Sequence, residues 1–280
     1  CRPLPEEGTK YFSCPLFLFW IMIQFLPSRE VAIAIGSFSI HWYGLMYMLA
    51  FAIALFLTPR IQKYRDLHIS KDEMASIVTW AIGGVIIGGR LGYVLFYEFS
   101  YFVSEPLEIF AVWHGGMSSH GGFIGVSIAL WFALKKYYIP LMPFLDIITV
   151  PIALGLACGR FGNFINLELY GIVTTLPWGI EIPGVEGLRH PTQIYAVVKD
   201  LSIAFLCFAL LTNRFIKTGM PFAVFLILYG VLRTIVEVFR VPSHAELDFG
   251  FIILTRGQAL SLPIVCIGFV LLMWTRSTAR

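Results

Sequence analysis

Charged residues are scarce in this sequence. Asp, Glu, Lys and Arg make up 13% of the 280 residues, about half of the roughly 25% found in a typical soluble domain. The net charge of +3 is spread over short segments, so the chain has no basic stripe of the kind that binds nucleic acid. Because 58% of the residues are hydrophobic and the mean hydropathy is +0.80, we predict an integral membrane protein.

Closely spaced cysteines and a serine nucleophile motif are also missing. None of the five cysteines belongs to a C-x-x-C pair, so the sequence predicts no disulfide framework, and neither a metal site nor a cofactor. The apolar segments contain no G-x-S-x-G motif. Ser118 and Ser119 lie too close to His120 along the chain to be activated by it. An intramembrane serine protease is therefore disfavoured.

Long apolar runs define the expected architecture. A helix that crosses a bilayer needs about 20 mostly apolar residues, and these runs do not alternate as transmembrane strands would. The sequence predicts an all-α, polytopic membrane protein with about seven transmembrane helices. In the third span, Lys135 and Lys136 end the apolar part early. The predicted spans are 38–58, 77–97, 119–138, 144–166, 194–213, 221–240 and 258–275.

Lys and Arg are distributed unevenly between the two sets of loops. The loops after the first, third and fifth spans and the C-terminal tail hold Arg60, Lys63, Arg65, Lys71, Lys135, Lys136, Arg214, Lys217, Arg276 and Arg280. From Arg29 onward, the opposite loops hold only Arg29, Arg189 and Arg256. Cytoplasmic loops carry the basic excess, so we expect the N-terminal side outside and the C-terminus in the cytoplasm.

The first residues do not fit this pattern. The apolar stretch 15–26 is too short to cross a bilayer. We therefore interpret residues 1–27 as an N-terminal extension, with the natural start expected at Met22, and residues 28–280 as a single seven-span domain.

Several charges fall inside the predicted spans, where each costs at least about 2.5–3.5 kcal/mol. They are Arg90, Arg160, Arg233 and Glu237. Arg233 and Glu237 are four residues apart and can pair on one helix; together with Tyr229 and Arg240 they share one helical face. The adjacent Lys199 and Asp200 are expected to snorkel to the surface, or to precede a span that begins near Leu201.

Two similar segments carry arginines late in even-numbered spans. Residues 89–98 read "GRLGYVLFYE" and residues 159–168 read "GRFGNFINLE". Such glycines serve either close helix packing or a shared role for Arg90 and Arg160. Asn163, Asn166 and Glu168 follow Arg160 closely, and this density of polar side chains favours a lined cavity.

The chemistry of this set points to an anionic lipid. Arginine donates paired hydrogen bonds to phosphate and keeps its charge. His120, on the outer side, can accept a proton at neutral pH. The following Gly121 and Gly122 are interpreted as leaving room and free amides for a ligand. These features favour either a reaction on an anionic phospholipid or its transport.

One segment carries a specific resemblance. Residues 159–171, "GRFGNFINLELYG", fit every fixed position of G-R-x-G-N-F-x-N-x-E-x-x-G, and the sequence resembles the prolipoprotein diacylglyceryl transferases. Further segments match the family in order: "HWYGLMY" (41–47), "GGRLGYVLFY" (88–97), "GGMSSHGGFIG" (115–125), "RHPTQIY" (189–195) and "YGVLRTIVEVFR" (229–240). The resemblance covers about residues 25–275.

The resemblance implies a transferase of the bacterial cytoplasmic (inner) membrane with its site toward the outer, periplasmic face. Such an enzyme moves the sn-1,2-diacylglyceryl group of phosphatidylglycerol to the lipobox cysteine of a prolipoprotein signal peptide and releases glycerol 1-phosphate. Its partners are those two substrates and the lipid bilayer, with no nucleic acid. The alternative function is an anionic phospholipid transporter or flippase.

The resemblance also implies roles for individual residues. Arg160 and Arg233 match arginines tied to phosphatidylglycerol binding and catalysis, and His120 matches a histidine proposed as a base. The remaining matches are assigned to phosphatidylglycerol binding: Asn163, Glu168, Gly171, Tyr43, Tyr229 and Glu237. The sequence departs from the family where His114 replaces an acid and Ala196 replaces glutamate. The roles of His114 and Arg90 are left open.

Overall fold

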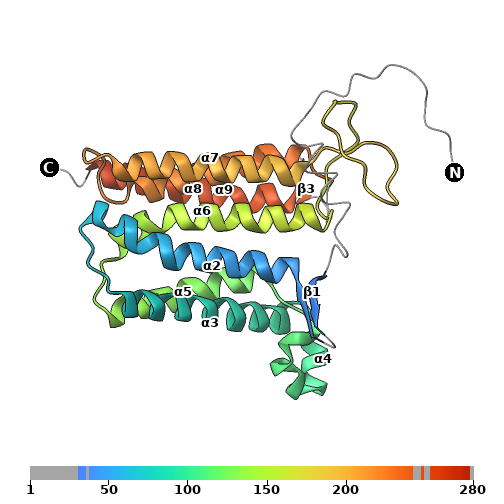
Figure 1. The fold of residues 1–280 in the computed structure, drawn as a ribbon, viewed down its shortest axis with the longest axis horizontal. Helices are drawn as coiled ribbons and strands as arrows, with labels where there is room; N and C mark the ends of the chain where they lie inside the picture. Colours follow the sequence, from blue (N-terminus) through green and yellow to red (C-terminus); the bar gives the residue numbers. More distant parts are fainter. Residues whose placement is uncertain (1–30, 36–37, 242–246, 249–252, 278–280) are drawn as a thin grey trace.

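The computed structural model describes residues 31–35, 38–241, 247–248 and 253–277. Within these residues, seven long helices run side by side along the long axis of the molecule (Figure 1). They are α2 (Trp42–Ile61), α3 (Lys71–Phe96), α5 (Ser119–Lys136), α6 (Leu141–Ile165), α7 (Thr192–Thr212), α8 (Met220–Val238) and α9 (Arg256–Ser277). The predicted N-terminal extension and the start at Met22 lie outside the described residues.

Short elements cap the bundle. They are β1 (Val31–Ile35), β2 (Phe38–His41), η1 (Gln62–Arg65), α4 (Phe99–Ser104), η2 (Pro106–Phe110), η3 (Val112–His114), β3 (Leu247–Asp248) and β4 (Ile253–Leu254). The strands form two antiparallel hairpins, β1–β2 and β3–β4. The all-α expectation therefore describes the bundle but omits these strands. The first helix begins at Trp42 rather than at 38, because residues 38–41 pair with β1.

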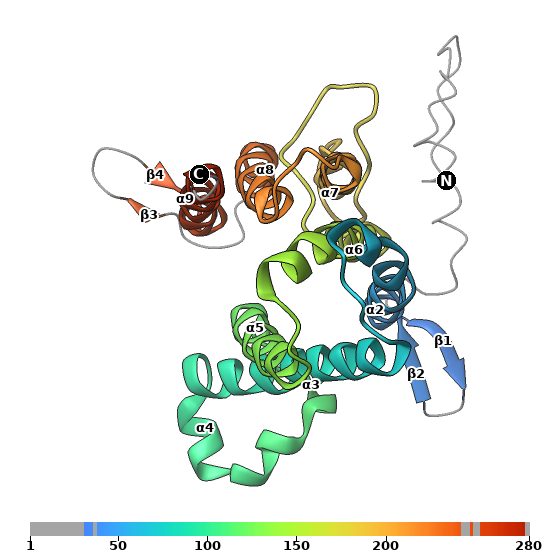
Figure 2. The same ribbon diagram turned by 90° about the vertical axis from the view of Figure 1, so that its left-hand side faces the viewer.

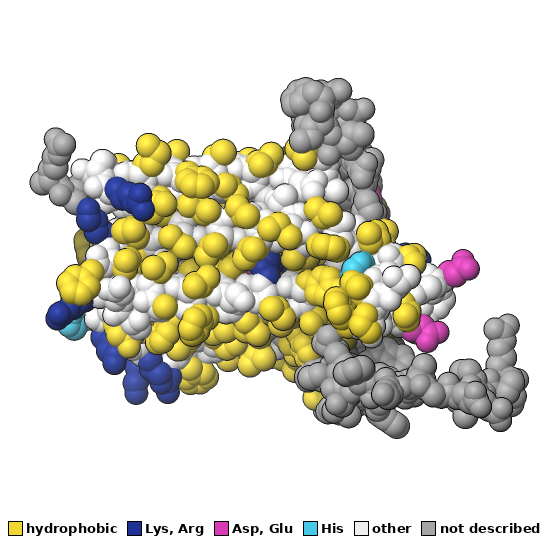
Figure 3. All heavy atoms as spheres, turned by 90° about the horizontal axis from the view of Figure 1, so that it is seen from above, with side chains coloured by type: hydrophobic (Ala, Val, Ile, Leu, Met, Phe, Trp, Pro, Cys, Tyr) yellow, Lys and Arg dark blue, Asp and Glu magenta, His cyan; other side chains and the backbone are white. Residues whose placement is uncertain are grey.

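Six of the long helices are long and apolar enough to cross a membrane, and α5 is not among them. The expected seven spans therefore exceed what length and composition support in the described residues. The 18 residues of α5 reach about 27 Å at 1.5 Å per residue, slightly less than a hydrocarbon core of about 30 Å. Hydrophobic side chains cover the flank of the bundle (Figure 3), so the chain is a multi-pass membrane protein.

The helix α6 lies at the centre of the bundle. It packs against α2 on one side and α7 on the other, and α8 and α9 continue the row beyond α7 (Figures 1 and 2). The main core includes fully buried Phe144, Ile147 and Ile203. A second, smaller core surrounds Phe164 and Ile180 and supports the loop 166–191.

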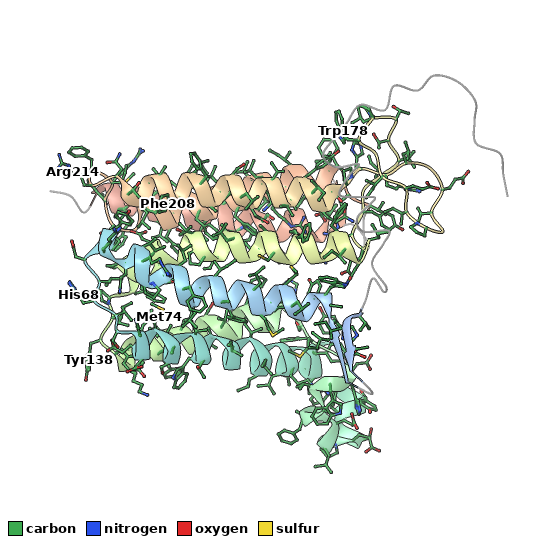
Figure 4. All side chains as sticks on the ribbon, in the orientation of Figure 1. His68, Met74, Tyr138, Trp178, Phe208 and Arg214 are labelled. Atoms are coloured by element: carbon green, nitrogen blue, oxygen red, sulfur yellow. The ribbon has the colours of Figure 1, made fainter. Side chains whose placement is uncertain are left out.

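One end of the bundle, here called the basic end, gathers lysines and arginines (Figure 3). It carries the loops after α2, α5 and α7, and His68, Tyr138 and Arg214 mark it in Figure 4. A buried ion pair holds this end together: Arg65 Nε donates to Asp146 Oδ2 at 2.7 Å. Asp146 also accepts from the backbone N–H of Gly219 at 2.8 Å, so it fixes the start of α8 against α6. The opposite end is called the site end.

The contact between α3 and α5 is made of glycines. A methyl group on Gly84 would lie 2.6 Å from the backbone oxygen of Gly125, and Gly88 and Gly92 face Gly121 in the same way. This close approach corrects the interpretation of Gly121 as room for a ligand. Its N–H is also occupied, because it donates to Ser118 Oγ at 3.2 Å and caps α5.

Arg90 has a structural role that the sequence did not specify. Its buried guanidinium donates to backbone carbonyls of the segment between α3 and α5, including Ile109 at 3.0 Å, Gly116 at 3.1 Å and Ala111 at 3.2 Å. The Phe102 ring lies 5.0 Å from its guanidinium carbon. Arg90 therefore anchors this segment to α3. His114, also left open, pairs with Glu108 on the exposed side of the segment.

Two adjacent glycines in α3 provide a matched test of the α3–α5 contact. Gly84→Ala forces a methyl group against the backbone of α5 and should lower stability by about 1–3 kcal/mol. Gly83 has no neighbouring atom within 4 Å of the corresponding position, so Gly83→Ala should be neutral or gain up to about 1 kcal/mol of helix propensity. Thermal unfolding in detergent measures both variants; equal melting temperatures would show that the contact is not tight.

Candidate functional site

A cavity lies at the site end. Its lining includes four cationic side chains, among them the arginines on α6 and α8 that the sequence pattern singled out. The cavity is narrow, with an accessible volume of about 20 Å³. Its walls come from α6, α7, α8 and the loop after α6. The lining residues are Arg160, Asn163, Leu169, Thr192, Gln193, Ala196, Lys199, Arg233, Val236 and Arg240.

The α6 wall is built by the C-terminal turns of that helix. Arg160 and Asn163 are three residues apart and therefore share a face; Arg160 Nη1 donates to Asn163 Oδ1 at 3.4 Å. The Asn163 amide in turn donates to Glu168 Oε1 at 3.0 Å, which fixes its orientation. No carboxylate pairs with Arg160 among the described residues, and a half-buried guanidinium in this position can receive an anion.

The α8 wall carries an ion-pair network. Glu237 accepts from Arg233, four residues earlier, and its Oε2 lies 3.6 Å from Arg240 Nη1. A methyl group on Gly257, in the first turn of α9, would lie 2.8 Å from Glu237 Oε1. The start of α9 therefore backs the carboxylate and directs both arginines toward the cavity. Burial lowers the pKa of Arg240 and Glu237 opposes this, but a guanidinium stays charged at neutral pH.

The α7 wall holds a buried ion pair that contradicts a prediction. Lys199 and Asp200 were expected to snorkel or to precede the span, yet α7 begins at Thr192 and both side chains are buried. Lys199 contacts Asp200, lines the cavity, and places its Nζ 4.6 Å from the ring centroid of Tyr229. The charges of Arg160 and Arg233 act on this pair.

The loop 166–191 closes the site end with a strained backbone. Leu167 and Leu169 have φ of 54° and 59°, a region that side chains other than glycine rarely adopt. Gly171 bridges to Arg240, and a methyl group on it would lie 2.5 Å from His190 Cβ. Gly171 thus positions the backbone of a lining arginine without lining the cavity itself.

An aromatic and imidazole network braces this loop against α7. Trp178, labelled in Figure 4, donates from Nε1 to the Tyr195 hydroxyl at 2.7 Å, and His190 Nδ1 lies 3.0 Å from the same hydroxyl. The loop is therefore held at the site end by side chains of the segment that enters α7.

The structure brings most of the predicted site residues together. Arg160, Asn163 and Arg233 line the cavity. Residues that contact or bridge to a lining residue are Glu168, Gly171, Tyr229 and Glu237. Tyr43 lies beside Gly162, with a ring carbon 3.5 Å from where a methyl group there would sit.

His120 is placed apart from this cavity. It lies in the first turn of α5 with an exposed side chain and is absent from the cavity lining. The helix that carries it packs chiefly on α3.

The two G-R-x-G segments have different roles in the structure, because Arg160 lines the cavity whereas Arg90 holds the segment between α3 and α5.

Sequence reasoning missed the contribution of α7. Thr192, Ala196 and Lys199 recur at helical spacing, with Gln193 beside them, so they share a face. The sequence pattern was sufficient to place Lys199 on the same helix face as Thr192 and Ala196, and therefore in the cavity lining. The spacing was the available signal.

The cavity is suited to an anion that carries more than one negative charge. Four cationic side chains line it, whereas the carboxylates that contact them are those of Asp200 and Glu237. Arginine forks match phosphate oxygens, and a site partly shielded from water strengthens this attraction. The site therefore favours a phosphate group.

Comparison with known proteins gives a consistent result. Residues 30–274 match the family model described as prolipoprotein diacylglyceryl transferase. A Geobacter sulfurreducens protein is 41% identical over 89% of this chain and 96% of its own length. Proteins of Coxiella burnetii and Pseudomonas aeruginosa are 40% identical over 90% of this chain and 97% and 96% of their lengths. All three are named phosphatidylglycerol–prolipoprotein diacylglyceryl transferase.

Proposed function

The chain belongs to the prolipoprotein diacylglyceryl transferase family, and we propose that the cationic cavity is where it performs the reaction. It is a transferase that moves a diacylglyceryl group from phosphatidylglycerol to a prolipoprotein. In the finer proposal, the sn-1,2-diacylglyceryl group passes to the lipobox cysteine and glycerol 1-phosphate leaves.

The observation that carries the proposal is that Arg160, which pairs with no carboxylate of the described residues, lines the same cavity as Arg233 of the Arg233–Glu237 pair. The phosphodiester of phosphatidylglycerol bears one negative charge and would lie between the two arginines. Asn163, Glu168, Tyr229 and Glu237 would support this binding by holding those cations in place, with Gly171 and Tyr43 shaping the surrounding walls.

The proposed step is a substitution at the glycerol carbon that carries the phosphate. The cysteine thiolate forms a C–S bond to this carbon while the C–O bond breaks, and the electron pair of that bond goes to the phosphate oxygen. The phosphate thereby changes from a monoanionic diester to a monoester with more negative charge. Arg160 and Arg233 would stabilise the charge that develops, which is the interaction that lowers a barrier most.

His120 is proposed to act on the thiol rather than on the phosphate, because it lies away from the cavity lining. No bonding partner for its exposed imidazole occurs in the described part of the chain. A free cysteine has a pKa near 8.5, so only a few per cent is thiolate at neutral pH, and a base that accepts the proton would raise that fraction.

The orientation follows from the charge of the two ends. The basic end is proposed to face the cytoplasm of a bacterial cell, in accordance with the excess of Lys and Arg there, and the site end would face outward. In this arrangement α5 is proposed as a seventh span, because it lies along α3 between the same two ends (Figure 1).

Removal of the unpaired arginine tests the proposed function. With purified protein in detergent, phosphatidylglycerol and a lipobox peptide, Arg160→Ala should reduce the rate on the order of 10²-fold or more. Released glycerol phosphate and the mass gain of the peptide measure the product. Arg214→Ala, at the exposed basic end, is the control and should keep its rate. Lipid movement without any covalent product in the wild type would instead support a transporter.

The role of His120 is tested by the pH dependence of the rate. His120→Gln should slow the reaction strongly near about pH 7, where the thiol is mostly protonated. The loss should shrink near about pH 9, where the thiol ionises without help because its pKa is near 8.5. A loss of equal size at both pH values would show that the side chain positions the segment rather than accepting the proton.

The orientation is tested with single cysteines at the two ends, introduced after the five native cysteines have been replaced by serine. His68→Cys at the basic end and Glu186→Cys in the loop 166–191 both replace exposed side chains. The cells are treated so that only the outer membrane is permeable, and a thiol reagent that cannot cross the cytoplasmic membrane is added. The reagent should label the Glu186→Cys variant, and it should label the His68→Cys variant only after the cytoplasmic membrane has been permeabilised. The reverse pattern would overturn the proposed topology.

A further inference from the structure

A glutamine at the start of α7 has a side chain that the proposed reaction does not yet use. Gln193 lines the cavity and is only 2% exposed. Its Nε2 donates to the backbone oxygen of Glu168 at 2.7 Å. The preceding Thr192 donates from its hydroxyl to the Leu169 oxygen at 2.8 Å. The first turn of α7 thus holds the strained backbone of the loop 166–191 by two side-chain hydrogen bonds.

The hydrogen bond from Gln193 to Glu168 determines which atom of the Gln193 amide is available to a ligand. A backbone carbonyl only accepts hydrogen bonds, so the nitrogen of the Gln193 amide must face Glu168 and the oxygen must point elsewhere. That oxygen, Oε1, is buried and accepts no hydrogen bond from any described residue. A buried acceptor without a donor is costly, so its presence in a cavity wall indicates a ligand group that donates to it.

A second unsatisfied atom belongs to another lining residue, on the α8 side of the cavity. Arg240 also lines the cavity, and its buried Nε has no acceptor among the described residues. In addition to its guanidinium and ammonium groups, the cavity therefore has a hydrogen-bond donor, Arg240 Nε, and an acceptor, Gln193 Oε1, that no described residue satisfies. A complementary ligand has a phosphate oxygen for the donor and a hydroxyl close to that phosphate for the acceptor.

The headgroup of phosphatidylglycerol has this combination. Its glycerol carries hydroxyls next to the phosphodiester, whereas the diacylglyceryl side offers only ester oxygens, which cannot donate. A headgroup ammonium could donate to Oε1, but Arg160, Lys199, Arg233 and Arg240 surround the cavity with positive charge and disfavour it. A thiol is a weak donor.

We propose that Gln193 is a specificity-determining residue that accepts a hydrogen bond from a headgroup hydroxyl of the lipid substrate. The proposal rests on the proposed function, since it assigns the headgroup contact of the same cavity. The preference for a hydroxylated headgroup then arises from a buried carbonyl oxygen that would be left unpaired with any other lipid. Sites of this kind reject an analogue that lacks the hydroxyl more strongly than apolar pockets reject a missing methylene.

The test compares two lipids of equal charge. Phosphatidylglycerol and phosphatidylethanol with the same acyl chains both carry a monoanionic phosphodiester, but only the first has headgroup hydroxyls. Each is supplied to the purified protein with a lipobox peptide, and the mass gain of the peptide, which is the same for both lipids, gives the rate. The wild type should prefer phosphatidylglycerol by about tenfold or more in kcat/KM.

The decisive quantity is the ratio of the two rates in the variants. Gln193→Met should bring the ratio close to one. Methionine has no carbonyl oxygen to accept a hydrogen bond, so the headgroup hydroxyl of phosphatidylglycerol no longer gives this lipid an advantage. A purely structural role, through the bond to Glu168, would slow both lipids alike and leave the ratio unchanged. Gln62→Met is the matched control: its amide also donates to a backbone carbonyl, that of Ile69, but at the basic end, so the ratio should stay at the wild-type value.

Each outcome has a definite meaning. Equal use of the two lipids by the wild type overturns the proposal without any variant, as does a Gln193→Met protein that keeps the wild-type ratio. If Gln193→Met does not fold, Gln193→Ala provides the same comparison. Absence of product from phosphatidylglycerol itself, with active lipid and peptide present, contradicts the proposed function rather than the role of Gln193.

Discussion

A charge inside an apolar bundle must find a partner, and this constraint organises the molecule. At the basic end Arg65 has Asp146, and near the site end Arg90 is surrounded by backbone carbonyls. Both arginines therefore hold helices or loops in place. Arg160 differs because its partner is the amide of Asn163, and none of the carboxylates in the described residues pairs with it. Within the bundle, the cavity thus combines Arg160 with three further cationic side chains, and an anionic ligand would balance their charge.

The scaffold around the cavity follows from close packing as much as from charge. Glycines bring α3 and α5 into backbone contact, so these two helices form a separate unit beside α2 (Figure 2). The cavity itself lies in the other half, between α6, α7 and α8. The cavity and the helix that carries His120 therefore belong to different halves of the bundle.

The sequence predicted the helices well because membrane spans require long apolar runs, and the boundaries of α6 and α7 differ by only a few residues from those expected. The signature of α6 also singled out Arg160 and Asn163, and both line the cavity. Lys199 was misplaced because a charge near the start of a span reads as solvent-facing unless its helical neighbours are compared. Gly121 was misread because a glycine pattern alone does not distinguish room for a ligand from contact with another helix.

The support that α9 gives to the ion pair on α8 concerns how the protein is made. Glu237 rests against Gly257, and α9 leaves the ribosome after α6, α7 and α8. A nascent chain that has inserted α6, α7 and α8 already contains every side chain that lines the cavity, yet the carboxylate that directs Arg233 still lacks its backing. The geometry of the site is therefore completed only after α9 has inserted.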